Sequence, residues 1–341
     1  MNYLTYLNIH HFKSIGELEI RDLSNINIIV GTNNSGKTSL LEAISILGNE
    51  DSVKSILNNV SRRSSTYPSN LESFLEIFPR EQDIDKSVKI KSTIKGLTRE
   101  LTINGNIVSD IEIKDEQDKT FLGNINVKLE DKTIIDKNIS IEENKDIRYL
   151  NDYDIINIVY VTPYDYYRGS LVENSFENVK EVDKANIIKL LNIFDPDILD
   201  FKIVKNMSSN KKSIYIEHKI YGLTSLFSFG DGIKKIFTLG VAIVNAKDGI
   251  LLVDEIESAI HKNHINRLFY NIINICKEYK VQLICTTHSL EVIDAIILSL
   301  GNQIDLLSCF RIEVCNNKTY YTKFSGDRLK DIRNLLGQDV R

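Results

Sequence analysis

The chain has 341 residues, 42% of them hydrophobic, which is enough to bury a sizeable core in one large or two ordinary domains. A formal net charge of −5 excludes a surface that is basic throughout, so nucleic acid is possible as a partner only through a local patch. The four cysteines lack the paired spacing of a zinc site, and no apolar run approaches the ~20 residues that cross a bilayer. We therefore expect reduced thiols, a cytoplasmic location and no membrane partner.

Strand patterns dominate the first 30 residues. Apolar and polar residues alternate in "YLNIHHF" and "GELEI", and the apolar run "INIIV" at 26–30 is typical of a strand buried on both faces. Apolar residues then recur at helical spacing from 37 to 47. Residues 50–80 are predicted to be mostly helical, with "SRRSSTYPSN" at 61–70 as a surface loop.

Between about 87 and 145 the pattern changes to short alternating runs. The runs "VKIKSTI", "RELTING", "IVSDIEI", "NINVKLE" and "IIDKNISI" are separated by "NG", "GN" and charged turns. This pattern favours antiparallel hairpins and predicts a β-rich subdomain.

The rest of the chain alternates strands and helices. We predict a buried strand at 156–163, helices within 171–194, and hairpin strands in "DFKIVKN" and "SIYIEHKI". From 228 onward the predicted order is a helix at 232–246, a strand at 249–255, a helix at 264–279, a strand at 281–287 and a helix at 289–300. The fold class is therefore α/β.

The segment "GTNNSGKT" at 31–38 fits the pattern G-x-x-x-x-G-K-[ST] between a predicted strand and a predicted helix. Two glycines allow the backbone N–H groups to face a polyphosphate, and the helix that follows adds its positive end. Lys37 is expected to reach the β and γ phosphates, and the Thr38 hydroxyl to bind Mg²⁺. The residues predicted to bind nucleotide here are Gly31, Asn33, Asn34, Ser35, Gly36, Lys37, Thr38 and Ser39.

Two carboxylates follow the apolar strand in "GILLVDE". Asp254 is expected to hold Mg²⁺ together with Thr38, and Glu255 to orient or polarise the attacking water. In "LICTTHS", His288 follows the next predicted strand and is expected at the same sheet edge, where it can hydrogen-bond the γ phosphate or the water. We predict catalytic roles for Lys37, Glu255 and His288.

The order of these motifs resembles the ABC-type ATPase heads of the OLD, RecF and SMC group, in particular the stand-alone AAA15 and AAA21 ATPases of bacterial defence loci. The resemblance covers nearly the whole chain. It implies a P-loop NTPase of ABC-ATPase type, with a mixed central sheet, helices and an antiparallel β-rich lobe, and with ATP and Mg²⁺ as cofactors. It also implies one domain over 1–341, with approximate lobes at 1–165 and 166–341.

Three further segments carry the resemblance. "HFKSIGELEI" resembles the opening strand pair of the group, which implies that Lys13 lies near the nucleotide phosphates or base. "SFGDGIKKI" resembles the signature segment, which caps the γ phosphate held by the partner subunit, and either Ser228 or Gly230 can take the position of the usual serine. "ESAIH" resembles the loop that crosses to the partner. The resemblance thus implies a homodimer or higher homo-oligomer, with Ser228, Gly230 and Gly232 contacting nucleotide.

The sequence departs from related proteins in two ways. Transporter-type heads place a glutamine after the strand that follows the β-rich lobe, but residues 151–200 contain none. OLD nucleases continue into a Toprim domain, whereas this sequence ends at "LLGQDVR", so we expect any nuclease to be another chain.

Two weaker patterns have alternative explanations. His261 and His264 have a helical spacing that suits a metal, but a solvated helix start explains them as well. The tyrosines at 164, 166 and 167 beside Arg168 can stack on bases, but packing between lobes is the more economical interpretation.

The sequence therefore predicts an ABC-type ATPase that hydrolyses ATP to ADP and phosphate and dimerises on ATP. We expect it to act as a switch for a separate effector, such as a nuclease or toxin, in phage defence. The alternatives are a DNA-repair ATPase like RecF or SMC, a slow ATP-gated scaffold, and a transporter subunit, which the missing glutamine disfavours.

Overall fold

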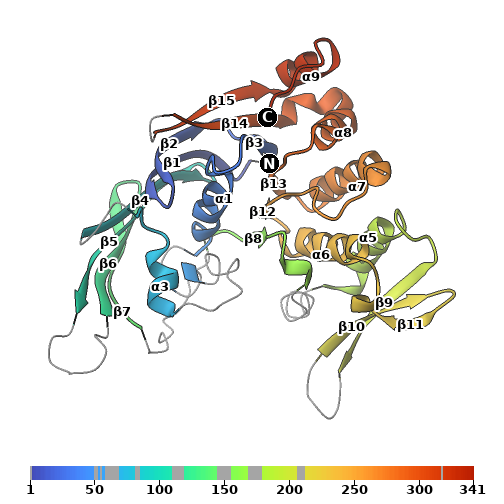
Figure 1. The fold of residues 1–341 in the computed structure, drawn as a ribbon, viewed down its shortest axis with the longest axis horizontal. Coiled ribbons are helices and arrows are strands. Elements are labelled where there is room, and N and C mark those ends of the chain that lie inside the picture. Colours follow the sequence, from blue (N-terminus) through green and yellow to red (C-terminus); the bar gives the residue numbers. More distant parts are fainter. Residues whose placement is uncertain are drawn as a thin grey trace.

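The computed structural model describes residues 2–49, 53, 56–57, 69–80, 85–109, 119–143, 155–167, 179–205, 212–315 and 318–341. These residues form three sheets with helices packed against them (Figure 1). The predicted α/β class, with a mixed central sheet and a separate antiparallel sheet, is confirmed. No helix in these ranges is long and apolar enough to cross a membrane.

The central sheet has the strand order β15-β14-β3-β13-β12-β8. Its strands are β3 (Ile26–Val30), β8 (Ile158–Val161), β12 (Ile250–Val253), β13 (Gln282–Thr286), β14 (Leu307–Cys315) and β15 (Lys318–Ser325). All neighbours pair in parallel except β14 and β15, which are antiparallel. Because parallel strands end at one edge, the loops after β3, β13 and β12 lie side by side there.

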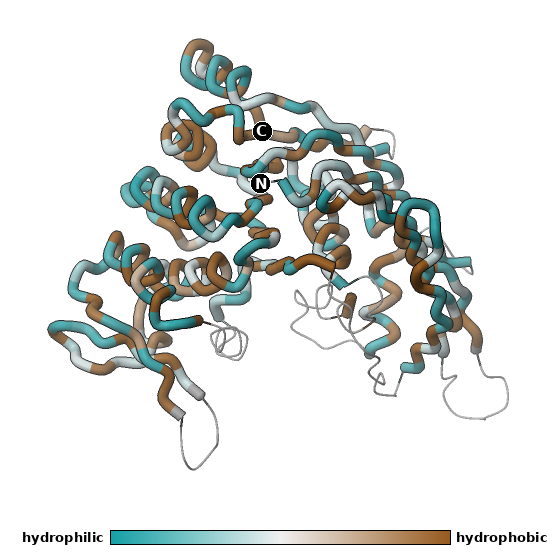
Figure 2. Tube along the Cα trace, turned by 180° about the vertical axis from the view of Figure 1, so that it is seen from behind, coloured by the Kyte–Doolittle hydropathy of each residue, from teal (hydrophilic) through white to brown (hydrophobic). Residues whose placement is uncertain are grey.

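Helices cover both faces of the central sheet. On one face lies α1 (Lys37–Ile46), whose apolar residues share a core with Leu252 of β12. On the other face lie α5 (Glu181–Leu191), α6 (Asp231–Asn245), α7 (Ile265–Glu278), α8 (Leu290–Leu300) and α9 (Gly326–Asn334). Their core includes Leu251 and Val253, which point away from Leu252 because successive strand residues face opposite sides. Figure 2 shows both hydrophobic and hydrophilic residues along these helices.

The β-rich subdomain is a six-stranded antiparallel sheet in the order β2-β1-β4-β5-β6-β7. It contains β1 (Leu4–Phe12), β2 (Ile15–Arg21), β4 (Asp85–Ile94), β5 (Leu97–Ser109), β6 (Lys119–Leu129) and β7 (Lys132–Glu142). The helix α3 (Asn70–Leu75) packs on it through Phe74, whose ring centre lies 5.2 Å from that of Phe121. The predicted antiparallel pairing is confirmed, but the runs "RELTING" and "IVSDIEI" do not form a hairpin, because residues 97–109 form the single strand β5 and residues 110–113 lie outside the described ranges.

The prediction of turns at "NG" and "GN" in this subdomain is wrong. Asn104-Gly105 and Gly123-Asn124 lie in the middle of β5 and β6, and the two glycines pair directly. A Cβ on Gly105 would approach the carbonyl oxygen of Leu122 and the Phe121 ring to 2.5 Å. The glycines therefore make room for an aromatic ring instead of forming turns.

The third sheet contains β9 (Ile198–Lys205), β10 (Lys212–His218) and β11 (Gly222–Ser225). Its first two strands confirm the predicted hairpin, and the helices and strands predicted between 232 and 300 are also present. The predicted lobes at 1–165 and 166–341 both supply strands to the central sheet. Residues 61–68 and 168–178, which include parts of the predicted loop and helices, lie outside the described residues.

Candidate active site

The phosphate loop, residues 31–38, joins β3 to α1. Gly31 has a φ of 145°, and a Cβ at this position would overlap the carbonyl oxygen of Ile312 in β14. Gly36 is the N-cap of α1 and has a φ of 92°. Both positions therefore require glycine, the first for close backbone approach and the second for a left-handed conformation.

The Lys37 side chain is held inside this loop. It is 7% exposed, and its Nζ donates to the carbonyl oxygens of Gly31 at 2.9 Å and Thr32 at 2.7 Å. Burial lowers the pKa of Lys37, while the nearby Asp254 carboxylate acts in the opposite direction. The loop thus holds the Lys37 ammonium at the place where its backbone N–H groups are proposed to surround a phosphate.

Asp254 directly follows β12 and connects this strand to the phosphate loop and to the end of β13. Its Oδ2 accepts from the Thr38 hydroxyl at 2.9 Å, and its Oδ1 accepts from the Thr286 hydroxyl at 2.7 Å. The Thr286 oxygen in turn accepts from the backbone N–H of Glu255 at 2.8 Å. Thr286, which the sequence analysis did not select, therefore fixes both acids relative to β13.

The donor set around Thr38 and Asp254 fits Mg²⁺. This ion prefers oxygen ligands and usually combines one or two protein groups with phosphate and water. The Thr38 hydroxyl and the Asp254 carboxylate already lie within hydrogen-bond distance of each other, and Asp254 is 2% exposed. One ion can therefore bind both groups.

Glu255 lies at a sharp turn directly after β12. Its side chain is exposed, and its φ of 47° is unusual for a residue other than glycine. Its neighbour Ile256 donates its backbone N–H to the Thr286 carbonyl oxygen at 3.1 Å, which keeps this turn on β13. The strained backbone thus presents one carboxylate to solvent beside the buried Asp254.

His288 follows β13 and lies at the edge that the sequence predicts. Its backbone N–H donates to Oε1 of Glu257 at 2.6 Å, and the loop after β12 therefore holds its main chain. Contact between the imidazole and the γ phosphate stays a prediction.

Lys235 is a second buried cation at this edge, and the sequence analysis did not select it. It comes from α6, is 0% exposed, and donates to the Ser258 hydroxyl at 2.9 Å. Burial lowers the pKa of Lys235 to about 8, although the carboxylates of Glu257 and Asp165 favour its charged form. Asp165 follows β8, where transporter-type heads carry the missing glutamine, and accepts from the backbone N–H of Thr162 at 2.7 Å.

The burial of Lys235 predicts a pH-dependent stability. Above a pH of about 8 the folded chain loses a proton that the unfolded chain keeps until about pH 10.4, so the free energy of unfolding rises with pH. Relative to Lys235→Met, the wild type should gain up to about 1.4 kcal/mol per pH unit within this range. Urea unfolding of both proteins from pH 7.5 to 9.5 measures the difference, and parallel stability profiles would contradict the prediction.

Lys13 forms an ion pair with Glu42 of α1, with 2.8 Å between Nζ and Oε2. It lies in the turn between β1 and β2 and is joined to the helix that follows the phosphate loop. The same turn places Ser14 beside Ser39, with 3.3 Å between their hydroxyl oxygens. The contact of Lys13 with nucleotide stays a prediction.

The signature segment lies at the start of α6. Ser228 is in a short 3₁₀ turn, Gly230 is the N-cap of α6 without a side-chain cap bond, and Gly232 is in the first helical turn. A Cβ on Gly232 would lie 3.3 Å from the carbonyl oxygen of Ala259, so this helix start packs on the "ESAIH" loop. The structure therefore groups the signature glycines with that loop on the sheet face opposite α1.

The alternative explanation finds support for the histidines, but for only one of the three tyrosines, because Tyr164 and Tyr167 are 53% and 55% exposed. The imidazole of His261 accepts from the backbone N–H of Asn263 at 3.4 Å, and the ring of His264 lies 4.6 Å from that of Phe194. Tyr166 is 6% exposed, as expected for packing between elements. Arg168 lies outside the described residues.

A cluster of Asp195, Asp197 and His218 has the composition of a metal site. However, Nδ1 of His218 accepts from the backbone N–H groups of Ile220 and Tyr221 at 3.1 and 3.2 Å. The ring proton of the neutral imidazole is therefore on Nε2, which lies 3.1 Å from the Asp195 carboxylate. This arrangement explains the cluster as a structural hydrogen-bond network.

Comparison with known proteins agrees with the fold and motifs. An ATP/GTP phosphatase of Helicobacter pylori is 23% identical over 324 residues, which cover 84% of this chain and 86% of that protein. The RecF protein of Idiomarina loihiensis is 50% identical over 46 residues, or 14% of this chain and 13% of RecF, so that likeness is local.

Two solved structures share the fold at 12% identity. The Smc head of Pyrococcus furiosus, bound to the C-terminal domain of ScpA, has a TM-score of 0.56 over 99% of this chain and 100% of that one. RecF bound to an ATP analogue has a TM-score of 0.51 over 94% and 98%.

The family match extends over most of the site. Residues 26–294 match the family described as "AAA domain, putative AbiEii toxin, Type IV TA system". This range includes the phosphate loop, Asp254, Glu255 and His288, which meet at one edge of the central sheet. The chain belongs to this family and is an ABC-type ATPase head of the AAA21 group.

Proposed function

We propose that this ATPase hydrolyses ATP in composite sites between two copies of the chain, as a switch that controls a separate effector chain. The observation that carries this proposal is the placement of the two phosphate-binding elements. The phosphate loop belongs to the sheet face of α1, whereas the N-terminus of α6 belongs to the opposite face. Two copies arranged head to head bring both elements to the same γ phosphate.

Each residue at the sheet edge has a role in this proposal. Lys37 binds the β and γ phosphates, while Thr38 and Asp254 hold Mg²⁺, which supplies positive charge to the phosphates. Glu255 orients the attacking water and accepts its proton, which its exposed position permits. His288 donates a hydrogen bond to the γ phosphate.

The N-terminus of α6 suits an anion because no side chain caps it. Gly230 has no side chain to accept from the helix. Its carbonyl oxygen accepts from the N–H of Ile233 at 3.1 Å, so the N–H groups of Asp231 and Gly232 remain available to a phosphate from a second copy. The partial positive charge of the helix end strengthens the attraction.

Gly230→Asp tests this role with little risk to folding. Gly230 has a φ of −65°, and a Cβ there meets nothing within 4 Å, so both Asp and Asn fit and both are good helix caps. The aspartate repels a phosphate, whereas asparagine does not. We expect hydrolysis to fall more than about tenfold further in Gly230→Asp than in Gly230→Asn, since one charge contact is worth 1.4 kcal/mol or more.

A mixing experiment tests the composite site directly. Lys37→Ala has an intact signature and Gly230→Asp has an intact phosphate loop, so a mixed dimer contains one complete site. Mixing the two impaired proteins should restore part of the wild-type turnover. Turnover that stays at the sum of the separate variants would contradict the composite site.

The proposed effector is a separate protein chain that binds the ATP state. The family description names a toxin system, and the Pyrococcus furiosus head is bound to a domain of another protein, which supports a partner chain. Affinity purification from the native host, with Glu255→Gln and ATP against the same protein with ADP, should enrich one partner in the ATP state. Equal recovery in both states would argue against an ATP-dependent switch.

A DNA-repair role is the second candidate, supported by the local identity to RecF. The net charge of −5 gives no general attraction to DNA. Binding of duplex DNA by the ATP-bound protein that weakens steeply with salt would favour this candidate over effector control.

A further inference from the structure

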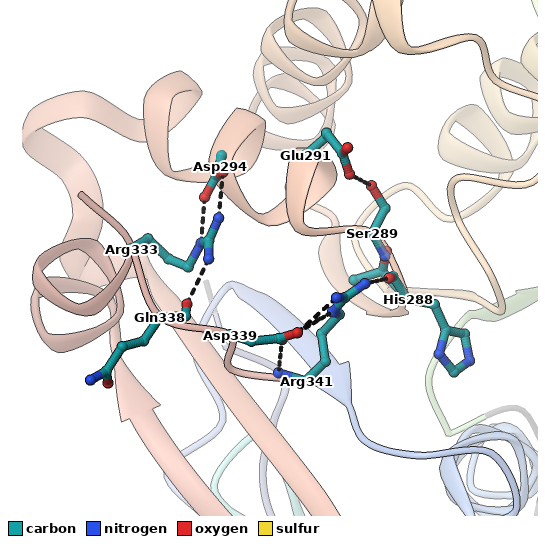
Figure 3. Close-up of polar contacts among 9 residues, drawn as sticks. His288, Ser289, Glu291, Asp294, Arg333, Gln338, Asp339 and Arg341 are labelled. Atoms are coloured by element: carbon teal, nitrogen blue, oxygen red, sulfur yellow. Dashed lines mark hydrogen bonds and ion pairs between the residues drawn. The ribbon is translucent and has the colours of Figure 1, made fainter. Parts of the chain in front are cut away.

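Residues 333–341 form a segment that returns to the active-site edge of the sheet (Figure 3). The guanidinium of Arg333 donates to both carboxylate oxygens of Asp294 in α8 at 2.8 Å and to the carbonyl oxygen of Gln338 at 2.6 Å. The side chain of Val340 is 2% exposed. The segment is thus fixed to the fold before its last residue.

Arg341 connects this segment to His288. Its Nη1 donates to the His288 carbonyl oxygen at 2.6 Å, while its Nε and Nη2 donate to the Asp339 carboxylate at 3.0 and 2.7 Å. Asp339 therefore sets the plane of the guanidinium and directs one N–H to the peptide. Arg341 holds the pKa of Asp339 down to about 2, so the pair is charged at neutral pH.

The main chain of His288 is held from two sides. Its N–H donates to Glu257, two residues after Glu255, and its carbonyl accepts from Arg341. The adjacent Ser289 is held within its own loop, because its N–H donates to the Thr287 hydroxyl at 3.0 Å. Figure 3 shows the imidazole directed away from Arg341, so the contact acts on the backbone and not on the ring.

We propose that Arg341, oriented by Asp339, is a positioning residue for ATP hydrolysis that sets the location of the His288 imidazole. Arg341 is exposed, and Val340 and Arg333 already anchor the segment, so the fold does not depend on this hydrogen bond. What the bond does fix is the peptide from which the imidazole extends. The inference rests on the proposed role of His288 at the γ phosphate.

Arg341→Ala should lower kcat about tenfold and leave the KM for ATP and the affinity for a non-hydrolysable analogue within twofold. Asp339→Ala should give a smaller loss of the same kind, and Arg341→Lys should recover part of kcat because lysine can still donate to the carbonyl. Arg328→Ala is the matched control: it removes an exposed arginine from α9 that lies over the Phe324 ring, and should retain kcat. Urea unfolding should show equal stability for the two Arg→Ala variants.

The double variant Arg341→Ala, His288→Ala separates this inference from the role of His288. If Arg341 acts through the imidazole, its replacement should have no further effect once His288 is alanine. Full activity of His288→Ala alone would refute the role of His288. Two results would overturn the positioning role of Arg341 while the role of His288 stands. In both, His288→Ala loses activity; in the first, Arg341→Ala keeps a normal kcat, and in the second, the losses of the single variants add in the double variant.

Discussion

Replacing Lys37 by alanine should lower the affinity for ATP at least about 100-fold and abolish hydrolysis. The Lys37 ammonium is buried in the phosphate loop and bonded to the carbonyl oxygens of Gly31 and Thr32, so it is already oriented before nucleotide arrives. Its loss removes the proposed charge-assisted contact to the β and γ phosphates, and a 100-fold change corresponds to about 2.7 kcal/mol.

Isothermal titration with a non-hydrolysable ATP analogue, together with a phosphate-release assay, measures both effects. Lys37→Met is the matched variant because it keeps a long apolar side chain without the charge. If alanine acted only through lost packing, Lys37→Met would still bind the nucleotide. Both variants should fail to bind. Normal affinity and turnover in a folded Lys37→Ala protein would remove the assignment of this loop to phosphate binding.

The phosphate loop was predictable because its chemistry is local. A buried strand, two glycines and a helix start follow one another within 15 residues, and each is visible in the sequence around Gly31 and Gly36. The structure adds the reason why Gly31 cannot change, which is the close approach of Ile312 from β14.

The contacts that organise the site were not predictable because they join distant segments. Thr286 bonds Asp254 across 32 positions of sequence, and Arg341 bonds His288 across 53. The sequence does not distinguish Lys235 from an exposed lysine near a helix start. The fold brings its side chain to Ser258 in the loop after β12. Such pairs depend on the sheet order, in which β13 lies between β3 and β12.

Two parts of the fold were missed for similar reasons. The elements after residue 300 were not predicted, although β14 pairs with β3 in the centre of the sheet. The dipeptide Asn104-Gly105 is typical of a hairpin turn. Here the glycine lies inside a strand and makes room for the ring of Phe121 on the next strand, which the dipeptide alone does not reveal. Local patterns therefore predict the elements better than their pairing.

Glu255→Gln should reduce hydrolysis at least about 100-fold while ATP binding remains near that of the wild type. Glutamine keeps the size of the side chain at an exposed position, so the contacts of Asp254 with Thr38 and Thr286 should persist. What is lost is the carboxylate proposed to orient and deprotonate water, a role worth 10²–10⁴ in rate in typical enzymes. Single-turnover hydrolysis measures the loss, with Glu278→Gln, an exposed site at the end of α7, as the matched control.

The same variant should accumulate a dimer with ATP and Mg²⁺. In the proposed composite site, an intact γ phosphate binds both the phosphate loop of one copy and the start of α6 in the other. A ligand that prefers the dimer shifts the equilibrium toward it. Light scattering should therefore give twice the monomer mass with ATP and the monomer mass with ADP. Adding Gly230→Asp to Glu255→Gln should abolish the ATP-dependent dimer, because the second contact with the γ phosphate is then repelled. A monomer in both nucleotide states, or a dimer that survives Gly230→Asp, would contradict γ-phosphate bridging between two subunits.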